Sequence, residues 1–375
     1  MNREILTLAI CSIASVACGN CSNTVKSDKV SLNRPQEPKR PFPYTEEHVS
    51  YDNHEAGVTL SGTLTLPTSE GPFPVVLLIA GSGPIDRDET VFDHKPFLVL
   101  ADYLTRQGIA VLRYDKRGCE KSTGNYDEAT SQEFSDDVLA GVAYIKSRRE
   151  VNPNQIGLIG HSEGGFIAPM VAAKSKDVAF IVIMGGTGVT GEEILYEQSA
   201  LIQRAVGATE DTIAESRKFQ EQMVSLVKGE SDRQIAAVQL QEIAKNFRST
   251  LQETLEKVTL EHLERVAARL NTKWFRYYLT FDPSIALKQV QVPVLVLNGE
   301  LDLQVSSKQN LPVISKALEE SGNKDVTIIE LPKLNHFFQT CETGSIAEYE
   351  KIEETLSPVA LNLIAEWVLA RTIQK

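Results

Sequence analysis

Six short segments of this chain are predominantly apolar and contain β-branched residues, the composition of strands that are buried on both faces of a sheet. They span residues 74–80, 109–114, 155–159, 179–184, 292–297 and 326–331. Segments with helical spacing alternate with them, at residues 96–107, 133–149, 164–174, 306–320 and 345–372. Because strands that alternate with helices form parallel sheets with right-handed crossovers, this pattern predicts an α/β fold with a doubly wound, mostly parallel sheet.

Two regions depart from this alternation. Residues 46–51 and 58–66 alternate apolar and polar side chains, which is typical of a half-buried β-hairpin. Residues 188–271 have helical spacing and contain no buried-strand run. We interpret this segment as an inserted helical cap that folds over the edge of the sheet, with an independent helical domain as the alternative. The core is then built from residues 44–187 and 272–375.

The first residues have the pattern of an export signal. Residues 5–17 are apolar, too short to span a bilayer and end in small side chains, so we expect a signal peptide at residues 1–17 and a periplasmic or cell-envelope location. The run that ends at Cys18 resembles the lipobox of bacterial lipoproteins, although Ser15 stands where an aliphatic residue is usual. The resemblance implies lipidation of Cys18 and membrane attachment, with an ordinary cleaved signal or a short anchor as the alternative. Residues 18–43 are polar and proline-rich, which predicts a flexible tether.

Charge and cysteine usage exclude several classes of function. The 50 acidic and 38 basic residues give a formal charge of −12, and there is no basic cluster of the kind that binds nucleic acid. Two cysteines, Cys119 and Cys341, lie in the globular part, where we expect isolated thiols, with a bridge between them as the alternative. Downstream of the tether no cysteine pair has metal-ligand spacing, and we expect neither a metal nor an organic cofactor.

A G-x-S-x-G pentapeptide runs from Gly160 to Gly164, directly after the predicted strand at 155–159 and at the start of a predicted helix. This setting is typical of a nucleophile elbow, a strained turn that exposes a serine hydroxyl. Side chains at Gly160 or Gly164 would collide with the neighbouring strand or helix, so glycine is needed at both. We therefore expect Ser162 to be a nucleophile, with a Gly-rich turn without chemistry as the alternative.

A serine hydroxyl needs a base to take its proton and an acid to orient that base, and in this kind of fold the chain order is serine, acid, histidine. Two histidines follow Ser162. His262 lies in a charged helical segment, whereas His336 lies in the loop after the last predicted strand and is the expected base. Asp302, in the loop after the preceding strand, is the expected acid. The alternatives are Glu300, which is nearer the strand end, and Asp282 and Asp325, which precede strands.

Acyl transfer also requires hydrogen-bond donors for the oxyanion that forms on the substrate. We expect two backbone N–H groups to supply them. One belongs to Glu163, directly after the nucleophile, and the other to Ser82, in the loop after the strand at 74–80. The charged residues that follow this loop are expected to brace it through ion pairs, with contact to the substrate as the alternative: Asp86, Arg87 and Asp88.

These motifs resemble the α/β-hydrolase family and, within it, capped bacterial esterases that carry Gly-Ser-Gly-Pro followed by Asp-Arg-Asp. The similar motifs lie at residues 81–84, 86–88, 114–118, 160–164, 298–305 and 334–339. Cys119 departs from the small or aliphatic residue expected after the third of these motifs. The resemblance implies the hydrolase fold and its serine triad. It is less specific for the substrate, because members of the family include carboxylesterases, thioesterases, acyltransferases and serine aminopeptidases.

The leading hypothesis is hydrolysis of a small or medium acyl ester through an acyl-enzyme intermediate. The alternative within the same fold is a thioesterase or a serine aminopeptidase. An aminopeptidase would need a carboxylate for the substrate amine, and the cap offers Glu192, Glu193 and Glu197. The non-enzymatic alternative is an envelope binding protein on a hydrolase fold, which loss of a triad member would favour; each member is present.

Overall fold

The computed structural model describes residues 33–250 and 259–372. The predicted signal peptide, Cys18 and the first part of the predicted tether lie outside these residues. The described chain divides into two compact units. The sheet unit comprises residues 33–126, 132–188 and 283–372, and the helical unit comprises residues 127–131 and 189–282, interrupted at 251–258.

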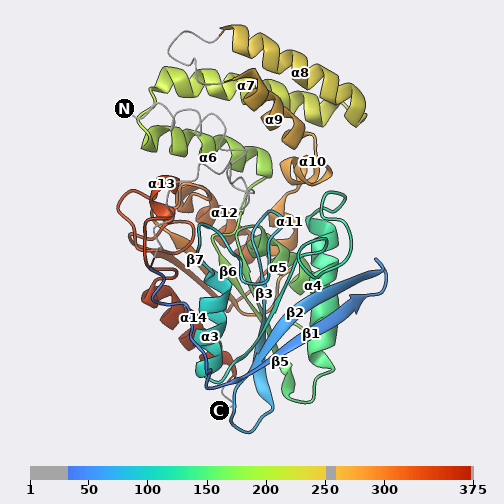
Figure 1. Ribbon diagram of the computed structural model, residues 1–375, viewed down its shortest axis with the longest axis vertical. Coiled ribbons are helices and arrows are strands. Elements are labelled where there is room, and N and C mark those ends of the chain that lie inside the picture. The colour runs from blue at the N-terminus through green and yellow to red at the C-terminus, as the bar shows by residue number, and fades with distance from the viewer. Residues whose placement is uncertain (1–32, 251–258, 373–375) are drawn as a thin grey trace. The chain divides into compact units, whose positions relative to one another are not determined.

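In the described residues of the sheet unit, eight strands form one sheet (Figure 1). They are β1 (Thr45–Asn53), β2 (Val58–Leu66), β3 (Phe73–Ile79), β4 (Ala110–Tyr114), β5 (Val151–His161), β6 (Phe180–Met184), β7 (Val294–Gly299) and β8 (Val326–Leu331). Their order is β1-β2-β4-β3-β5-β6-β7-β8. The hairpin of β1 and β2 and the pair β2–β4 are antiparallel, and the other neighbours are parallel. The doubly wound, mostly parallel sheet predicted from the sequence is therefore confirmed.

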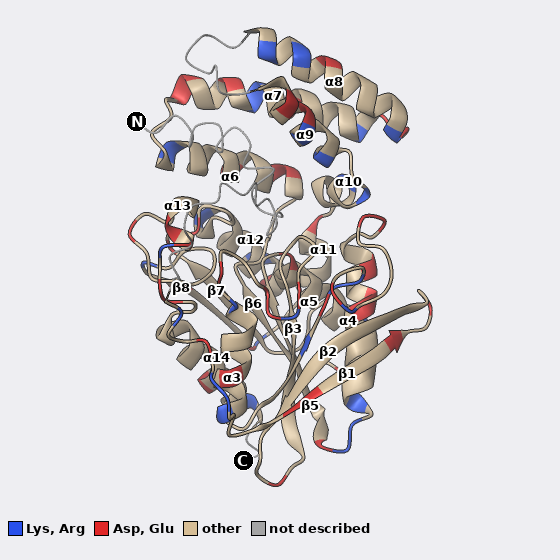
Figure 2. Ribbon diagram, viewed as in Figure 1, with Lys and Arg blue, Asp and Glu red and all other residues tan. Residues whose placement is uncertain are grey.

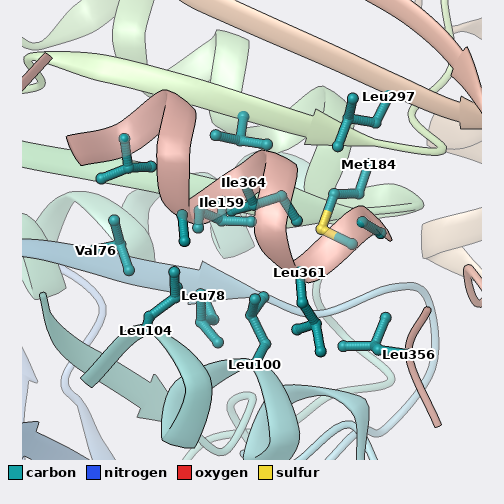
Figure 3. Close-up of a cluster of buried hydrophobic side chains, with 14 of the residues drawn as sticks. Val76, Leu78, Leu100, Leu104, Ile159, Met184, Leu297, Leu356, Leu361 and Ile364 are labelled. Atoms are coloured by element: carbon teal, nitrogen blue, oxygen red, sulfur yellow. The ribbon is translucent and has the colours of Figure 1, made fainter. Parts of the chain in front are cut away.

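Helices cover both faces of this sheet because alternate strand residues point to opposite sides. On one side, Val76 and Leu78 pack into a core cluster with α3 (Pro96–Arg106) and α14 (Pro358–Thr372), which Figure 3 shows. On the other, Leu77 faces α4 (Ser131–Lys146), where a Cβ added to Gly141 would lie 2.6 Å from a Leu77 methyl carbon. The helix α5 (Glu163–Lys174) contacts β5 and β6, and α12 (Ser307–Glu320) contacts β7 and β8. A short helix, α11 (Pro283–Leu287), packs on α5 and α12.

The predicted helix at 345–372 is wrong, because two helices occupy this range. A single turn, α13 (Ile346–Tyr349), is separated from α14, which begins at Pro358. Two amide groups of the intervening segment, those of Thr355 and Leu356, are not available for helical hydrogen bonds, since both donate to the side-chain oxygen of Gln36. Proline at the first position of α14 is compatible with a helix start, because that position needs no N–H donor.

The predicted tether at 18–43 is also wrong for its last part, because residues 33–43 dock on the sheet unit. Arg34 donates to four backbone carbonyl oxygens from two distant loops, those of Phe92, Asp93, Glu350 and Ile352. A polar, proline-rich segment is a flexible tether when its side chains are hydrogen-bonded only to water. Here the guanidinium of Arg34, which has five N–H donors, is hydrogen-bonded to carbonyl groups of the sheet unit instead.

The helical unit contains α6 (Gly191–Ala205), α7 (Glu210–Gly229), α8 (Arg233–Thr250), α9 (Leu260–Leu270) and α10 (Lys273–Thr280). It extends to Asp282, beyond the expected boundary at Asn271, because α10 buries Phe275 and Leu279 in the apolar cluster of this unit. Its helices carry charged residues of both signs (Figure 2), several of them in ion pairs three or four residues apart. None of the helices in the described ranges combines the length and the apolar character that crossing a bilayer requires.

Candidate active site

Ser162 lies on the turn between the end of β5 and the start of α5, in a strained backbone conformation with φ of 52° and ψ of −114°. The two glycines of the pentapeptide make this turn possible, as expected from the sequence. A Cβ added to Gly160 would lie 1.9 Å from the carbonyl oxygen of Gly164, and one added to Gly164 would lie 1.9 Å from that of Ile79. The turn therefore closes only with glycine at both positions.

His336 and Asp302 form a buried pair. The imidazole Nδ1 lies 2.8 Å from Asp302 Oδ2, and both side chains are at most 2% exposed. The other carboxylate oxygen accepts the backbone N–H groups of Gln304 and Val305, each at 2.8 Å, so the carboxylate is held in one orientation. Because Nδ1 donates to a carboxylate, the Nε2 atom of His336 is left as the basic nitrogen.

The alternative residues considered from the sequence are engaged elsewhere. Glu300 is exposed and accepts the backbone N–H of Lys333. Asp325 forms an ion pair with Arg371. Asp282 and His262 belong to the helical unit, where the His262 ring contacts the guanidinium of Arg265.

Ser162 and the His336–Asp302 pair lie at the same edge of the sheet. The Ser162 amide donates to the carbonyl of Met184, at the end of β6. The next residue, Gly185, lies against the pair, since a Cβ added there would be 3.4 Å from both the His336 ring and Asp302 Oδ2. The hydrogen bonds of the described residues include none between Ser162 Oγ and His336. Such contacts are often long before substrate binds.

The loop from Gly81 to Gly83 passes beside the serine, since a Cβ added to Gly81 would lie 3.3 Å from the Cβ of Ser162. The flanking N–H groups of this loop are occupied: Gly81 donates to Glu89 at 2.7 Å and Gly83 to the Tyr126 hydroxyl at 3.0 Å. Among the hydrogen bonds of the described chain, none engages the Ser82 N–H between them. The Glu163 N–H lies at the first position of α5, where a helix provides no acceptor of its own.

The charged residues after this loop form ion pairs and hydrogen bonds that hold it. Arg87 makes a two-pronged contact with Asp115, with N–O distances of 3.0 and 2.6 Å, and also donates to two hydroxyl groups of β2. Asp88 pairs with the buried Arg113. Asp86 instead accepts from the hydroxyl and the backbone N–H of Thr90. Arg87 and Asp88 thus form ion pairs as expected for this segment, whereas Asp86 contributes hydrogen bonds instead.

A second buried pair, Glu89 and His161, was not singled out by sequence reasoning. One oxygen of Glu89 accepts both the Gly81 N–H and the His161 Nδ1, at 2.7 and 2.9 Å, and His161 Nε2 donates to the carbonyl oxygen of His336 at 2.9 Å. The pair therefore links the loop at Ser82 to the loop of His336. Burial lowers the pKa of His161 and the Glu89 carboxylate raises it, with a net shift above its ordinary value.

This raised pKa predicts a pH-dependent stability. A histidine with a raised folded-state pKa contributes stability that is fully present below its unfolded pKa, about 6.5, and is lost as pH rises through the folded value. Glu89→Gln removes the charge that raises the pKa. We therefore expect the unfolding free energy of the variant to decline less than that of the wild type as pH rises above about 6.5.

Urea unfolding at a series of pH values measures this effect. Glu300→Gln makes the same chemical change at an exposed carboxylate and serves as the control, with the wild-type slope expected. Equal slopes for Glu89→Gln and the wild type would contradict the pairing.

Sheet order and a serine on the strained turn after β5 define the α/β-hydrolase class of serine hydrolases. Residues 56–328, well over half of the chain, match the X-Pro dipeptidyl-peptidase (S15 family). The chain belongs to this family.

Curated relatives include an esterase and thioesterases. Esterase EstD of Thermotoga maritima is 28% identical over 313 residues, which cover 83% of this chain and 65% of the relative. The mitochondrial acyl-coenzyme A thioesterase 2 of Mus musculus is 29% identical over 157 residues, which cover 40% of this chain and 31% of the relative. The chain thus spans less than two thirds of the length of these proteins.

Solved structures share the fold at low identity. An esterase of Pyrococcus furiosus superposes with a TM-score of 0.53 at 15% identity, covering 92% of this chain and 98% of the other. The α/β hydrolase GrgF of Penicillium sp. sh18 superposes with a TM-score of 0.54 at 16% identity, covering 89% of this chain and all of the other. At these identities the likeness supports the fold.

Proposed function

We propose that this protein hydrolyses small to medium carboxylic esters through Ser162, His336 and Asp302. The observation that carries the proposal is the buried Asp302–His336 hydrogen bond of 2.8 Å, at the sheet edge where the strained turn presents Ser162. A carboxylate on Nδ1 leaves Nε2 as the base, which is the protonation state that a serine nucleophile requires. The 28% identity to an esterase over most of the chain supports the ester as substrate.

The reaction follows from these groups. His336 Nε2 takes the proton of Ser162 as its Oγ attacks the ester carbonyl, and the resulting oxyanion is stabilised by the N–H groups of Ser82 and Glu163. His336 then gives the proton to the leaving alcohol, which leaves an acyl group on Ser162. A water molecule, activated by the same imidazole, hydrolyses this acyl-enzyme and restores the serine.

Two contacts in the helical unit favour an esterase over an aminopeptidase. Of the carboxylates considered for binding a substrate amine, Glu193 is part of the capping box at the start of α6, with Thr190. Glu192 pairs with Lys228 and accepts from the Tyr196 hydroxyl. At Glu192 and Glu193 an amine would have to displace these partners, which costs the hydrogen bonds already formed. Glu197, the third carboxylate considered, has no ion pair within the described residues, so the aminopeptidase alternative rests on it.

Parallel assays with three substrates of similar size test the proposal. We expect kcat/KM for a p-nitrophenyl ester to exceed that for a dipeptide p-nitroanilide by at least about 100-fold, a difference of roughly 2.7 kcal/mol in transition-state stabilisation. An acyl-coenzyme A thioester of the same chain length gives the third value. Faster turnover of the anilide or the thioester than of the ester would contradict the proposal and assign that class of compound as the substrate.

Location and the role of the helical unit are further proposals. We propose export with a lipid on Cys18, supported by the apolar run at residues 5–17 and the small residues before the cysteine. Cys18→Ala should move the protein from the membrane to the soluble fraction of the cell envelope and abolish incorporation of labelled palmitate; unchanged fractionation and labelling would refute it.

We also propose that the helical unit sets acyl-chain preference, as expected of a cap. Truncation of residues 188–271 should then shift the preferred chain length in an ester series, and an unaltered profile would contradict this.

A further inference from the structure

A buried lysine beside the candidate oxyanion hole has no part in the proton transfers above. Lys116 follows β4, and its side chain is 1% exposed. The Nζ atom donates to the carbonyl oxygen of Gly81 at 2.6 Å and to Oε2 of Glu163 at 2.8 Å, and it lies 4.7 Å from the centre of the Phe134 ring. Two of the ammonium's three donors are thereby bound to named acceptors.

Both acceptors are linked to the N–H groups proposed to stabilise the oxyanion, those of Ser82 and Glu163. The carbonyl of Gly81 and the N–H of Ser82 are the two ends of one planar peptide group, so a hydrogen bond that orients the oxygen also orients the N–H. A positive charge on the oxygen strengthens the N–H as a donor, because hydrogen bonds in a chain polarise one another. Glu163 supplies the second donor through its own backbone N–H.

We propose that Lys116 is a positioning residue for acyl transfer, which orients and polarises the Gly81–Ser82 peptide so that its N–H stabilises the oxyanion. The inference rests on the proposed function, since it assigns Lys116 to the same reaction. The Glu163 carboxylate compensates the ammonium charge in the buried environment, where an unpaired cation would be costly. Glu89 accepts the N–H of Gly81 from the other side of the same residue, so both neighbouring peptide groups are held.

The competing explanation is a purely structural ion pair that joins the end of β4 to α5. The next residue, Arg117, offers a matched comparison. Its guanidinium is also buried and pairs with Asp137 of α4 at 2.6 Å. Within the described residues its hydrogen bonds go to Asp137 and Glu133 rather than to the loop at Gly81. Loss of either cation removes a buried ion pair, but only Lys116 contacts the candidate oxyanion loop.

The test compares Lys116→Met with Arg117→Met in the full chain, with rates normalised to active sites titrated by a fluorophosphonate. For Lys116→Met we expect kcat on a p-nitrophenyl ester to fall about 10- to 100-fold with KM within about threefold, less than the 10²–10³ lost when a donor is removed outright. A trifluoromethyl ketone, which forms an oxyanion on the serine, should lose affinity by the same factor. Arg117→Met should lower the melting temperature and keep kcat per active site.

Lys116→Gln completes the series, because its amide can still donate to the Gly81 carbonyl without a charge. We expect its kcat to lie between those of the wild type and Lys116→Met, and it provides the comparison if the methionine variant does not fold. Wild-type kcat and ketone affinity in the lysine variants, or an equal loss of kcat in Arg117→Met, would overturn the inference. Full activity of Ser162→Ala would instead overturn the proposed function, so the two failures are distinguishable.

Discussion

Replacing Ser162 with alanine is expected to lower kcat for ester hydrolysis by about 10⁶-fold, because removal of the nucleophile from a serine triad leaves only substrate binding and the oxyanion donors. The turn itself should survive, since its geometry depends on the glycines on either side of Ser162 rather than on the hydroxyl group. We therefore expect the variant to fold with an unchanged melting temperature. Assay of p-nitrophenyl acetate hydrolysis, together with covalent labelling by a fluorophosphonate, measures both the activity and the loss of the reactive serine.

Ser147→Ala is the matched control for this experiment. Ser147 is exposed directly after α4, and its hydroxyl donates to the backbone carbonyl of Tyr144, so its replacement should leave both turnover and labelling at wild-type levels. Retention of more than a small fraction of the activity by Ser162→Ala, or labelling of that variant, would assign the chemistry to another residue.

The fold was predictable because its strands are visible in the sequence as apolar runs. Residues such as Val76 and Val182 lie in strands covered by helices on both faces, so every side chain in those strands is apolar and the run stands out. The pentapeptide around Ser162 was equally visible, because the close approach of Gly160 and Gly164 to the neighbouring backbone leaves no space for other residues.

The hydrogen bonds that link the site were not predictable in the same way. Glu89 is 72 residues from its partner His161, and Lys116 is 35 residues from Gly81. Each looks like an ordinary surface charge in the sequence, since a charged residue is usually exposed. Burial becomes favourable only when the folded sheet brings the partner alongside, and no local pattern encodes that partner.

A similar reason explains the errors at the chain ends. Arg34 docks residues 33–43 through carbonyl groups of loops that lie 58 to 318 residues away, and the Gln36 side chain occupies amide groups in the segment before Pro358. Periodicity reports the tendency of a segment by itself. It does not report which backbone groups a distant side chain will occupy.

Asp302→Asn is expected to lower kcat by about 10⁴-fold through the tautomer of His336. The N–H groups of Gln304 and Val305 point at Oδ1 and require an acceptor there, so the asparagine must place its carbonyl oxygen on them and its NH₂ group toward His336. A donor then faces Nδ1, which can accept it only if the ring proton moves to Nε2. In that tautomer Nε2 cannot take the proton of Ser162.

Kinetics at several pH values, combined with proton NMR of the imidazole N–H signals, check this result. We expect KM to change little, because Asp302 acts through His336 and does not contact the substrate in the proposed reaction. Glu300→Gln is the matched control: this carboxylate lies two residues earlier in the same loop, and the amide oxygen of glutamine can still accept the Lys333 N–H. Loss of activity in Glu300→Gln with retention in Asp302→Asn would reverse the assignment of the acid, whereas loss in Asp302→Asn alone identifies the carboxylate on Nδ1 as the group that holds the base in its reactive form.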